Sequence, residues 1–237
     1  MKTHPPRHVL VTGANRGIGL EFTRQLLARG DRVVATAREP GRATALNTLA
    51  GEYPGHLHVL PLDITQPRAH AELVRELPLV LEDARVDLLI NNAGVLHSGE
   101  RFGALDLDNL EHSFRTNAAG PYLLTQALEP QLADGARVVN MSSRIGAIGL
   151  TTRYSTPSYA ISKAALNMAT VLLAQALSVR DVVVVAVSPG WVRTDMGGEQ
   201  AEVAPEDAVA GLLARVDDLS MSNSGSFFDW QGEPIPW

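Results

Sequence analysis

Tyr159 and Lys163 are four residues apart in an alanine-rich segment that favours a helix. At that spacing two side chains lie on one helical face, with their Cβ atoms about 6 Å apart. A phenol has a pKa of about 10, and a neighbouring ammonium lowers it, so the pair could exchange a proton near neutral pH. Lys163 and Lys2 are the only lysines among 20 basic residues. An ordinary surface Tyr/Lys pair is the alternative.

Ser143 and Asn117 are two further candidates for a catalytic role. Ser143 follows an apolar run, 136–141, that is typical of a buried strand, and a hydroxyl at a strand end can polarise a carbonyl oxygen. A turn or helix cap is the alternative for Ser143. Asn117 falls in the middle of a helix predicted over 109–128, where asparagine is unfavourable. It therefore marks a site or faces solvent.

Gly13, Gly17 and Gly19 lie between a predicted strand, 9–11, and a predicted helix, 18–29. Glycines there let the backbone turn tightly and approach a pyrophosphate, which the N–H groups and the positive end of the helix dipole would bind. The spacing differs from the usual G-x-G-x-x-G of dinucleotide-binding proteins. A tight turn without a ligand is the alternative reading of this loop.

Arg38 follows the second predicted strand, 32–37, where an acidic residue usually binds the ribose of NAD. An arginine suits the 2′-phosphate of NADP instead, because a guanidinium can bind phosphate with two hydrogen bonds. Arg16, inside the glycine loop, could reach the same phosphate. Solvated surface arginines are the alternative. The two arginines and the missing acid favour NADP(H) over NAD(H).

Two more strand ends carry candidate cofactor contacts. Asp63 follows the strand predicted over 57–60 and could accept a hydrogen bond from an adenine amine or cap the next helix. The segment 91–94, Asn-Asn-Ala-Gly, follows the strand predicted over 86–90 and offers small residues where a ligand approaches the backbone. A plain turn is the alternative there.

These candidates need a framework that brings strand ends together. Apolar, β-branched runs alternate with helical patterns, which predicts βαβ units and a parallel sheet covered on both faces. Ligands of such sheets lie at the carboxyl ends of the strands. We therefore expect one Rossmann-like, doubly wound α/β domain of about seven strands over 1–237. The predicted strands are 9–11, 32–37, 57–60, 86–90, 136–141, 182–187 and 227–230, and the predicted helices are 18–29, 42–49, 67–77, 109–128, 158–177 and 205–216.

The composition agrees with that framework and excludes several classes of protein. The chain has 237 residues, 45% hydrophobic and 19% charged, which argues for a packed core and against disorder. The absence of cysteine excludes disulfides and thiolate metal sites. A net charge of −6 speaks against nucleic-acid binding. We find no signal peptide and no apolar run of about 18 residues, so a cytoplasmic protein without a membrane segment is expected.

The order and spacing of these motifs resemble the short-chain dehydrogenase/reductase family. The segments 189–198 and 228–232 are similar to its small carbonyl-reductase branch, which contains Sniffer-type and C-factor-type proteins. The resemblance implies that Tyr159 is the general acid or base and that Lys163 lowers its pKa and holds the nicotinamide ribose. It implies that Ser143 orients the carbonyl and that Asn117 holds a water of a proton relay. The implied cofactor contacts are Gly13, Asn15, Arg16, Gly17, Ile18, Gly19, Arg38, Asp63, Ile64, Asn91, Ala93, Gly94, Tyr159, Lys163, Pro189, Gly190, Val192 and Thr194.

The expected activity is hydride transfer between NADP(H) and a small carbonyl or secondary alcohol (EC 1.1.1.-), without a metal. The alternative is an NADP(H)-binding signalling protein of the C-factor type with incidental turnover. The pocket is expected to include Leu96, His97, Ile145 and Tyr154 beneath a short polar segment, 197–204. Arg144 and Arg153 could attract an acidic substrate, with solvated surface charges as the alternative. A homodimer is expected because the helices over 109–128 and 158–177 are apolar on more than one stripe, although burial within one chain is the alternative.

Overall fold

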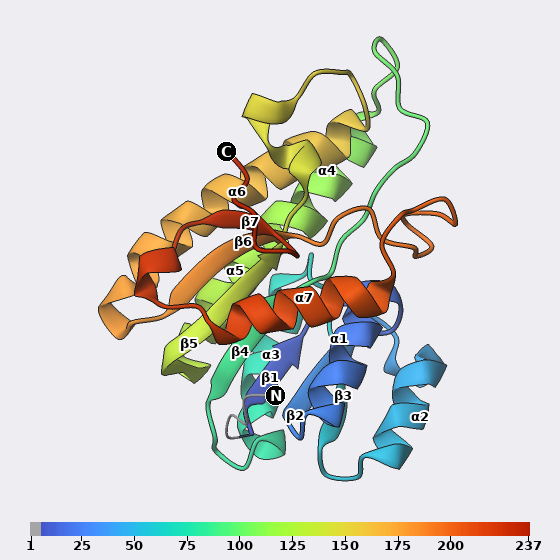
Figure 1. Ribbon diagram of the computed structural model, residues 1–237. Coiled ribbons are helices and arrows are strands. Elements are labelled where there is room, and N and C mark those ends of the chain that lie inside the picture. Colours follow the sequence, from blue (N-terminus) through green and yellow to red (C-terminus); the bar gives the residue numbers. More distant parts are fainter. Residues whose placement is uncertain (1–5) are drawn as a thin grey trace.

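The computed structural model describes residues 6–237, and its centre is one seven-stranded parallel sheet (Figure 1). The order is β3-β2-β1-β4-β5-β6-β7, so the chain builds the sheet outward in both directions from β1. This confirms the predicted Rossmann-like, doubly wound fold. Lys2 and the rest of the segment 1–5 lie outside the described residues. The strands are β1 (His8–Val11), β2 (Arg32–Ala37), β3 (Leu57–Pro61), β4 (Val86–Asn91), β5 (Leu132–Met141), β6 (Val183–Ser188) and β7 (Phe227–Asp229).

Helices cover both faces of the sheet. The long helices are α1 (Gly17–Ala28), α2 (Thr44–Glu52), α3 (Pro67–Val80), α4 (Leu107–Phe114), α5 (Gly120–Leu128), α6 (Pro157–Leu177) and α7 (Pro205–Asp217). The short ones are η1 (Pro40–Arg42), η2 (Arg115–Ala119), η3 (Glu129–Gln131), η4 (Arg144–Gly146), η5 (Ile148–Leu150), η6 (Ser178–Arg180) and η7 (Met221–Asn223). Helices α1, α2 and α7 pack on one face, and α3, α5 and α6 on the other.

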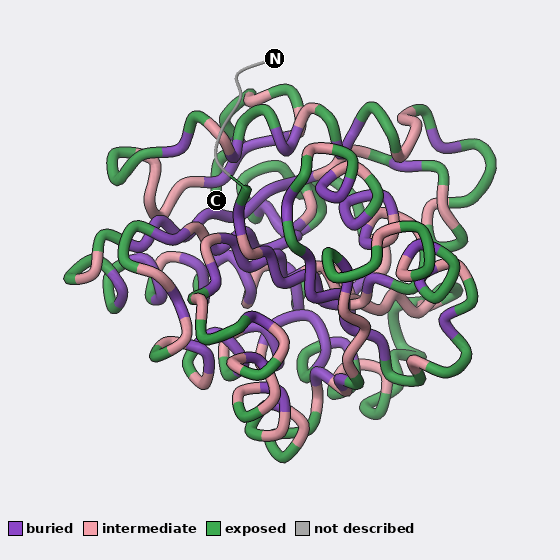
Figure 2. Tube along the Cα trace, turned by 90° about the horizontal axis from the view of Figure 1, so that it is seen from below, coloured by how far each residue is buried: buried purple, intermediate pink, exposed green. Residues whose placement is uncertain are grey.

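Two apolar cores lie between the sheet and these helix layers. Along β1, Val9 and Val11 point into one core while Leu10 points into the other, as the alternation of a strand requires. Figure 2 shows the buried backbone running through the middle of the molecule, with exposed segments around it. A sheet covered on both faces leaves its carboxyl edge as the place where polar loops can meet a ligand.

The helix predicted over 109–128 is interrupted in the structure. One turn of π-helix, η2, separates α4 from α5. Pro121 has no N–H to donate to the carbonyl of Asn117 four residues earlier, so a regular α-helix cannot continue through this point. The prediction of one continuous helix was wrong, and the Gly120-Pro121 dipeptide is the sequence signal for the break.

The other predicted elements are present with boundaries that differ by a few residues. The largest difference is at β5, which begins at Leu132 instead of Ala136. The predicted sixth strand, 182–187, is shifted by one residue, and the closing strand ends at Asp229. None of these differences moves a candidate residue away from the carboxyl edge of the sheet.

Helix α6, with the turn that follows it, is the one described segment long and apolar enough in composition to cross a membrane. From the sequence we expected no apolar run of this length. In the structure Leu173, Ala174 and Leu177 of α6 are buried in the core beneath the sheet. Core packing therefore accounts for the apolar character of that side of the helix.

Candidate active site

A cavity of about 390 Å³ lies at the carboxyl edge of the sheet. It extends from the loops after β1 and β2 to the start of α6, so one continuous space joins the glycine loop to Tyr159. Asn92, His112, Ser142 and Asp195 also line it and were not predicted. The predicted residues that line it are Gly13, Asn15, Arg16, Gly17, Ile18, Arg38, Asp63, Ile64, Ala93, Gly94, Tyr159, Lys163, Pro189 and Thr194.

The remaining predicted site residues lie behind or beside the cavity wall. Gly19, Asn91, Asn117, Ser143, Gly190 and Val192 do not line it. Asn91 is buried, and its amide donates to Thr125 Oγ1 at 3.1 Å and to Asn140 Oδ1 at 2.8 Å. Its side chain therefore joins strands and helix beneath the site instead of facing a ligand.

The glycine loop brings β1 and β4 together at the cavity floor. Gly13 has φ +63°, and a Cβ on it would come within 2.8 Å of Ala93 Cα. A Cβ on Gly19 would overlap the Asn92 amide nitrogen and the Gly13 carbonyl oxygen. Both positions therefore need glycine for close backbone approach. Helix α1 begins at Gly17, and its N-cap residue, Arg16, makes no side-chain cap, so the first-turn N–H groups remain open to an anion.

Asn92 fastens the loop after β4 to the glycine loop. Its amide donates to Thr12 O at 2.9 Å and to Gly13 O at 3.0 Å. Thr12 Oγ1 in turn accepts from the backbone N–H groups of Asn92 and Ala93, each at 3.0 Å. The sequence signal was the paired asparagine, and only its neighbours Asn91, Ala93 and Gly94 were predicted to contact the cofactor.

Asp63 serves a local turn and does not cap the following helix. Its Oδ1 accepts from Thr65 N at 2.9 Å and from Thr65 Oγ1 at 2.7 Å. The N-cap of α3 is Gln66, three residues further on. The helix-cap alternative for Asp63 was therefore wrong, while its position in the cavity wall leaves the predicted contact with a ligand open.

Two arginines of the cavity wall lie in different electrostatic settings. Arg16 Nη1 forms an ion pair with Asp195 Oδ2 at 2.8 Å, which links the glycine loop to the segment after β6. Arg38 is exposed and has no hydrogen bond or ion pair within residues 6–237. A free guanidinium at this position can accept an anionic partner without breaking an existing pair.

Tyr159 and Lys163 line the other end of the cavity, and Ser143 lies beside them. Lys163 Nζ donates to Met141 O at 2.7 Å and lies 5.4 Å from the centre of the Tyr159 ring. A hydrogen bond joins Ser143 to the Tyr159 side chain. Ser143 Oγ also accepts from Ile145 N at 3.3 Å, so the cap that we considered as its alternative role is present as well.

Burial dominates the proton affinities of this pair. It raises the pKa of Tyr159 to about 12, and the Ser143 hydrogen bond opposes that change. It lowers the pKa of Lys163 to about 7. Both changes favour the neutral forms, because a low-dielectric environment disfavours charge. The expected lowering of the Tyr159 pKa by a neighbouring ammonium is therefore not what this structure shows.

Asn117 is fully buried in the π-helical turn η2. Its Oδ1 accepts from Val95 N at 2.8 Å, and its Nδ2 donates to Val95 O at 2.9 Å and to Ser162 Oγ at 2.9 Å. Ser162 Oγ donates to Tyr159 O at 2.7 Å. The solvent-facing alternative was wrong, because this side chain ties the loop after β4 to the helix that carries Tyr159 and Lys163.

Gly146 allows η4 to approach α6 closely. A Cβ at this position would lie 2.7 Å from both the carbonyl carbon and the Cβ of Lys163. The short η4 turn follows Ser143 directly, so this contact fixes the distance between the serine and the helix. No periodic pattern marks Gly146, because the constraint on it comes from a tertiary contact.

The expected substrate pocket is only partly joined to the cavity. His112 of α4 lines it, and His112 Nδ1 lies 3.2 Å from Nε2 of His97. Leu96, His97, Ile145 and Tyr154 were predicted to belong to the pocket but do not line this cavity. The segment after β6 contributes Thr194, Asp195 and Met196 to the wall, and the predicted covering segment follows them directly in the chain.

Residues 7–204 match the short chain dehydrogenase family, and the chain belongs to that family. It is similar to the C-signal protein of Myxococcus xanthus, with 42% identity over 154 residues, 64% of this chain and 93% of that protein. It is also similar to 1-hydroxy-2-glutathionyl-2-methyl-3-butene dehydrogenase of Rhodococcus sp. (strain AD45). That relative is 34% identical over 233 residues, 97% of this chain and 99% of its own length.

Solved structures of carbonyl reductases share the fold over nearly the whole chain. The NADPH-bound carbonyl reductase from chicken fatty liver has a TM-score of 0.93 and 36% identity, covering 99% of this chain and 100% of that one. The carbonyl reductase Sniffer of D. melanogaster has a TM-score of 0.94 and 30% identity, covering 98% and 100%. The predicted relationship to the small carbonyl-reductase branch is therefore confirmed, and the chain is a carbonyl-reductase-like oxidoreductase of this family.

Proposed function

We propose that this protein transfers a hydride between NADP(H) and a small carbonyl or secondary alcohol. The observation that carries the proposal is a single cavity with a proton-exchanging trio, Ser143, Tyr159 and Lys163, near one end and a free arginine, Arg38, at the other. Such a space fits a dinucleotide whose nicotinamide lies by the tyrosine and whose phosphates lie by the glycine loop. The NADPH-bound relative supports the choice of cofactor.

The described residues fit this cofactor. The uncapped first turn of α1 offers N–H groups for a pyrophosphate. Gly13 and Gly17, with φ +63° and +55°, hold the backbone in left-handed conformations and place no side chain at these two positions. Arg38 would hold a 2′-phosphate, and Lys163 is the one buried cation that reaches the cavity near Tyr159 among residues 6–237.

The dinucleotide supplies the hydride when it is bound, and the protein supplies the proton. In reduction the Tyr159 hydroxyl would donate its proton to the carbonyl oxygen, and in oxidation the phenolate would accept it. Ser143 would hold the carbonyl oxygen through its hydroxyl. Lys163 in its ammonium form would stabilise the phenolate, because opposite charges at close range each favour the charged form of the other.

Asn117 contributes to this mechanism by position. Each polar atom of its side chain already has a partner in Val95 or Ser162. Pro121 cannot supply the usual α-helical donor to the backbone carbonyl of Asn117. We propose that this carbonyl holds the water of a relay toward Lys163, which narrows the role expected for the whole residue to its main chain.

The direction of the reaction should depend on pH because Tyr159 has a pKa of about 12. The neutral phenol needed for reduction is present throughout the neutral range, whereas the phenolate needed for oxidation becomes populated only as the pH rises. We expect the kcat for alcohol oxidation to rise with pH between 7 and 10 and the kcat for reduction to stay flat over the lower half of that range. Initial rates in both directions at saturating cofactor test this, and an oxidation rate that falls with pH contradicts it.

The primary test is oxidation of NADPH and NADH, followed at 340 nm, against aldehydes, ketones and quinones. The panel includes glutathione conjugates, because the Rhodococcus relative is named for a glutathionyl substrate. Turnover with NADPH on part of the panel supports the proposal. Tight NADPH binding with no turnover on any member contradicts it.

Arg38→Asp should weaken NADPH binding far more than NADH binding. The substitution removes the partner of the 2′-phosphate and brings a like charge to it, and we expect the Kd for NADPH to rise by about 100-fold, the scale of one charge-assisted contact replaced by repulsion. Calorimetric titration with both cofactors measures this. Arg75→Asp, on the exposed side of α3, is the matched control. Equal losses for the two cofactors would show that Arg38 does not touch the 2′-phosphate.

A signalling role of the kind named for the Myxococcus relative is the second candidate function. The 42% identity to C-signal is the observation that favours it. A protein that only binds NADP(H) does not need a proton donor, however, and Ser143, Tyr159 and Lys163 are all present and joined by contacts. We therefore place the enzymatic role first and use Tyr159 to separate the two.

We also propose that the protein is a homodimer. Leu107 and Phe114 on α4 and Ile161, Met168 and Leu172 on α6 are exposed by 47–64%. Helices α4 and α6 pack against each other, so these apolar side chains belong to neighbouring surfaces. Light scattering should give twice the chain mass of 25.4 kDa, and a mass equal to one chain would refute the dimer.

A further inference from the structure

Most arginines of this acidic chain are engaged by a partner. Arg7, Arg29 and Arg180, for example, form ion pairs, and Arg85, Arg137 and Arg193 donate to backbone carbonyls. The arginines whose side chains have no hydrogen bond or ion pair within the described residues 6–237 are Arg38, Arg75, Arg101, Arg144, Arg153 and Arg215. Arg38 is already assigned to the cofactor. Three of the others, Arg101, Arg144 and Arg153, come from the two loops that follow β4 and β5.

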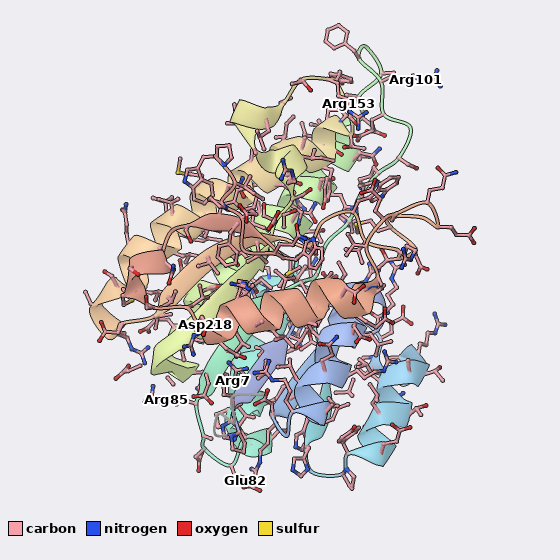
Figure 3. The ribbon with its side chains drawn as sticks, viewed as in Figure 1. Arg7, Glu82, Arg85, Arg101, Arg153 and Asp218 are labelled. Atoms are coloured by element: carbon pink, nitrogen blue, oxygen red, sulfur yellow. The ribbon has the colours of Figure 1, made fainter. Side chains whose placement is uncertain are left out.

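These two loops meet beyond the catalytic trio. The ring of Phe102 packs edge-on against the ring of Tyr154 with centroids 5.9 Å apart, and each aromatic residue directly follows one of the arginines. Figure 3 shows Arg101 and Arg153 at the same end of the molecule, on segments next to each other. Arg144 directly follows Ser143 in the η4 turn. One free arginine is therefore next to the serine that would hold the carbonyl oxygen, and the other two lie on loop segments that contact each other through Phe102 and Tyr154.

The acidic residues of these loops are occupied elsewhere. Glu100 Oε2 accepts from Ser158 N at 3.1 Å at the start of α6, and Asp106 Oδ1 accepts from Asp108 N at 2.9 Å at the start of α4. The segment 143–157 contains Arg144 and Arg153 and no acidic residue. The carboxylates are thus held at helix N-termini, where the dipole favours them, and the guanidinium groups remain exposed.

We propose that the substrate is a carbonyl or alcohol that carries a carboxylate, which Arg101, Arg144 and Arg153 attract and bind. Arginine is suited to this because its planar guanidinium matches a carboxylate with two hydrogen bonds. Exposed cations also raise the local concentration of an oppositely charged ligand. The inference rests on the proposed hydride transfer and adds the chemical class of the substrate.

The test compares two ketones that differ only in charge. S-(3-oxobutyl)glutathione carries free carboxylates, and its diethyl ester carries the same ketone and peptide with both carboxylates capped. At low salt with NADPH we expect kcat/KM to be about tenfold higher for the acid. Exposed ion pairs each contribute up to about fivefold, so Arg101→Gln and Arg153→Gln should each reduce the acid-to-ester ratio by about two- to fivefold. Added salt should reduce it in the same way.

Arg75→Gln is the matched control, because Arg75 is also exposed and free of partners but lies on α3. It should leave the ratio unchanged, and kcat/KM for the ester should be the same in all variants. An acid-to-ester ratio of one, or an equal effect of Arg75→Gln, overturns the inference. If neither ketone reacts, both are measured as inhibitors of the best panel substrate, and equal inhibition constants overturn it. Absence of turnover on the whole panel instead overturns the proposed function.

Discussion

Tyr159→Phe is expected to reduce kcat for carbonyl reduction by about 1,000-fold, which lies within the 10²–10⁴-fold range of general acid catalysis. The substitution removes only the hydroxyl oxygen, and the ring keeps its packing beside Lys163, whose Nζ lies 5.4 Å from the ring centre. The variant should therefore fold and bind NADPH with a Kd within about threefold of the parent. Single-turnover reduction and calorimetric titration measure the two quantities separately.

Ser143→Ala is the comparison for Tyr159→Phe. It removes the partner of the Tyr159 hydroxyl and leaves the acid itself in place, so a smaller loss of about 10- to 100-fold is expected, the scale of one lost hydrogen bond to the reacting group. If Tyr159→Phe retained more than a tenth of the parental kcat, another group would have to donate the proton. If NADPH binding were lost together with turnover, Tyr159 would be needed to build the site.

The same variant separates the two candidate functions. A signalling role that needs only bound NADP(H) should survive Tyr159→Phe, because the cofactor contacts proposed for Arg38 and the glycine loop are untouched. A biological output that persists at full strength in this variant would show that turnover is not the source of that output. An output lost in parallel with kcat would assign the biology to the reaction.

The sequence predicted the carboxyl edge of the sheet well because its signals there are local. A strand followed by a glycine loop and a helix places Gly13 and Gly17 at the same edge as Arg38, Gly94 and Lys163, and the cavity contains all five. Gly13, Arg38 and Gly94 follow the ends of predicted strands, and Gly17 and Lys163 lie near the starts of predicted helices. The parallel topology then brings them together without any long-range information.

The contacts between elements were not predictable in the same way. No contact was predicted for the Asn92 side chain, although it joins the loop after β4 to the glycine loop. Its role depends on the carbonyls of Thr12 and Gly13, which follow a different strand. Gly146 owes its role to α6, which approaches within van der Waals distance of it. Periodicity and turn preferences carry no information about such neighbours, since they describe only one segment at a time.

The proton affinities of Tyr159 and Lys163 also depend on the folded environment. Four-residue spacing on a helix correctly places the ammonium near the phenol, and from it we expected a lowered tyrosine pKa. The depth of burial decides the actual direction, and burial raises the pKa of Tyr159 to about 12 and lowers that of Lys163 to about 7. Desolvation of the two groups outweighs the attraction between the Lys163 ammonium and the Tyr159 phenolate.

Lys163→Met is expected to stabilise the unliganded protein while abolishing turnover. Lys163 is 4% exposed, and its pKa falls from 10.5 to about 7 on folding. At 1.36 kcal/mol for each pKa unit, keeping the ammonium buried costs up to about 5 kcal/mol. Methionine fills a similar volume without that cost, although it also loses the hydrogen bond to Met141 O, worth about 1 kcal/mol.

The pH dependence of this effect has a definite sign. Below pH 7 the lysine is charged in both the folded and the unfolded chain, so the whole cost of burial acts against folding. Between pH 7 and 10.5 the folded chain holds the neutral amine while the unfolded chain still binds the proton, so the stability of the parent rises with pH. The advantage of Lys163→Met should therefore be largest at pH 6, smaller at pH 9 and absent near pH 10.5.

Urea unfolding at pH 6 and pH 9 measures the free energies of unfolding of the parent and of Lys163→Met. Arg38→Met, which removes an exposed cation, is the control, and we expect it to change the free energy of unfolding little at either pH. A difference independent of pH would mean that Lys163 is not titrating as a buried group, and a less stable Lys163→Met protein would mean that the Met141 contact outweighs the burial of charge. Saturating NADPH should narrow the gap, because the parent keeps the lysine proposed to hold the nicotinamide ribose and therefore gains more stability from the cofactor than Lys163→Met does. The burial of this lysine lowers the stability of the free protein, and its contact with the cofactor offsets that loss. Its presence is therefore explained by its role in the complex.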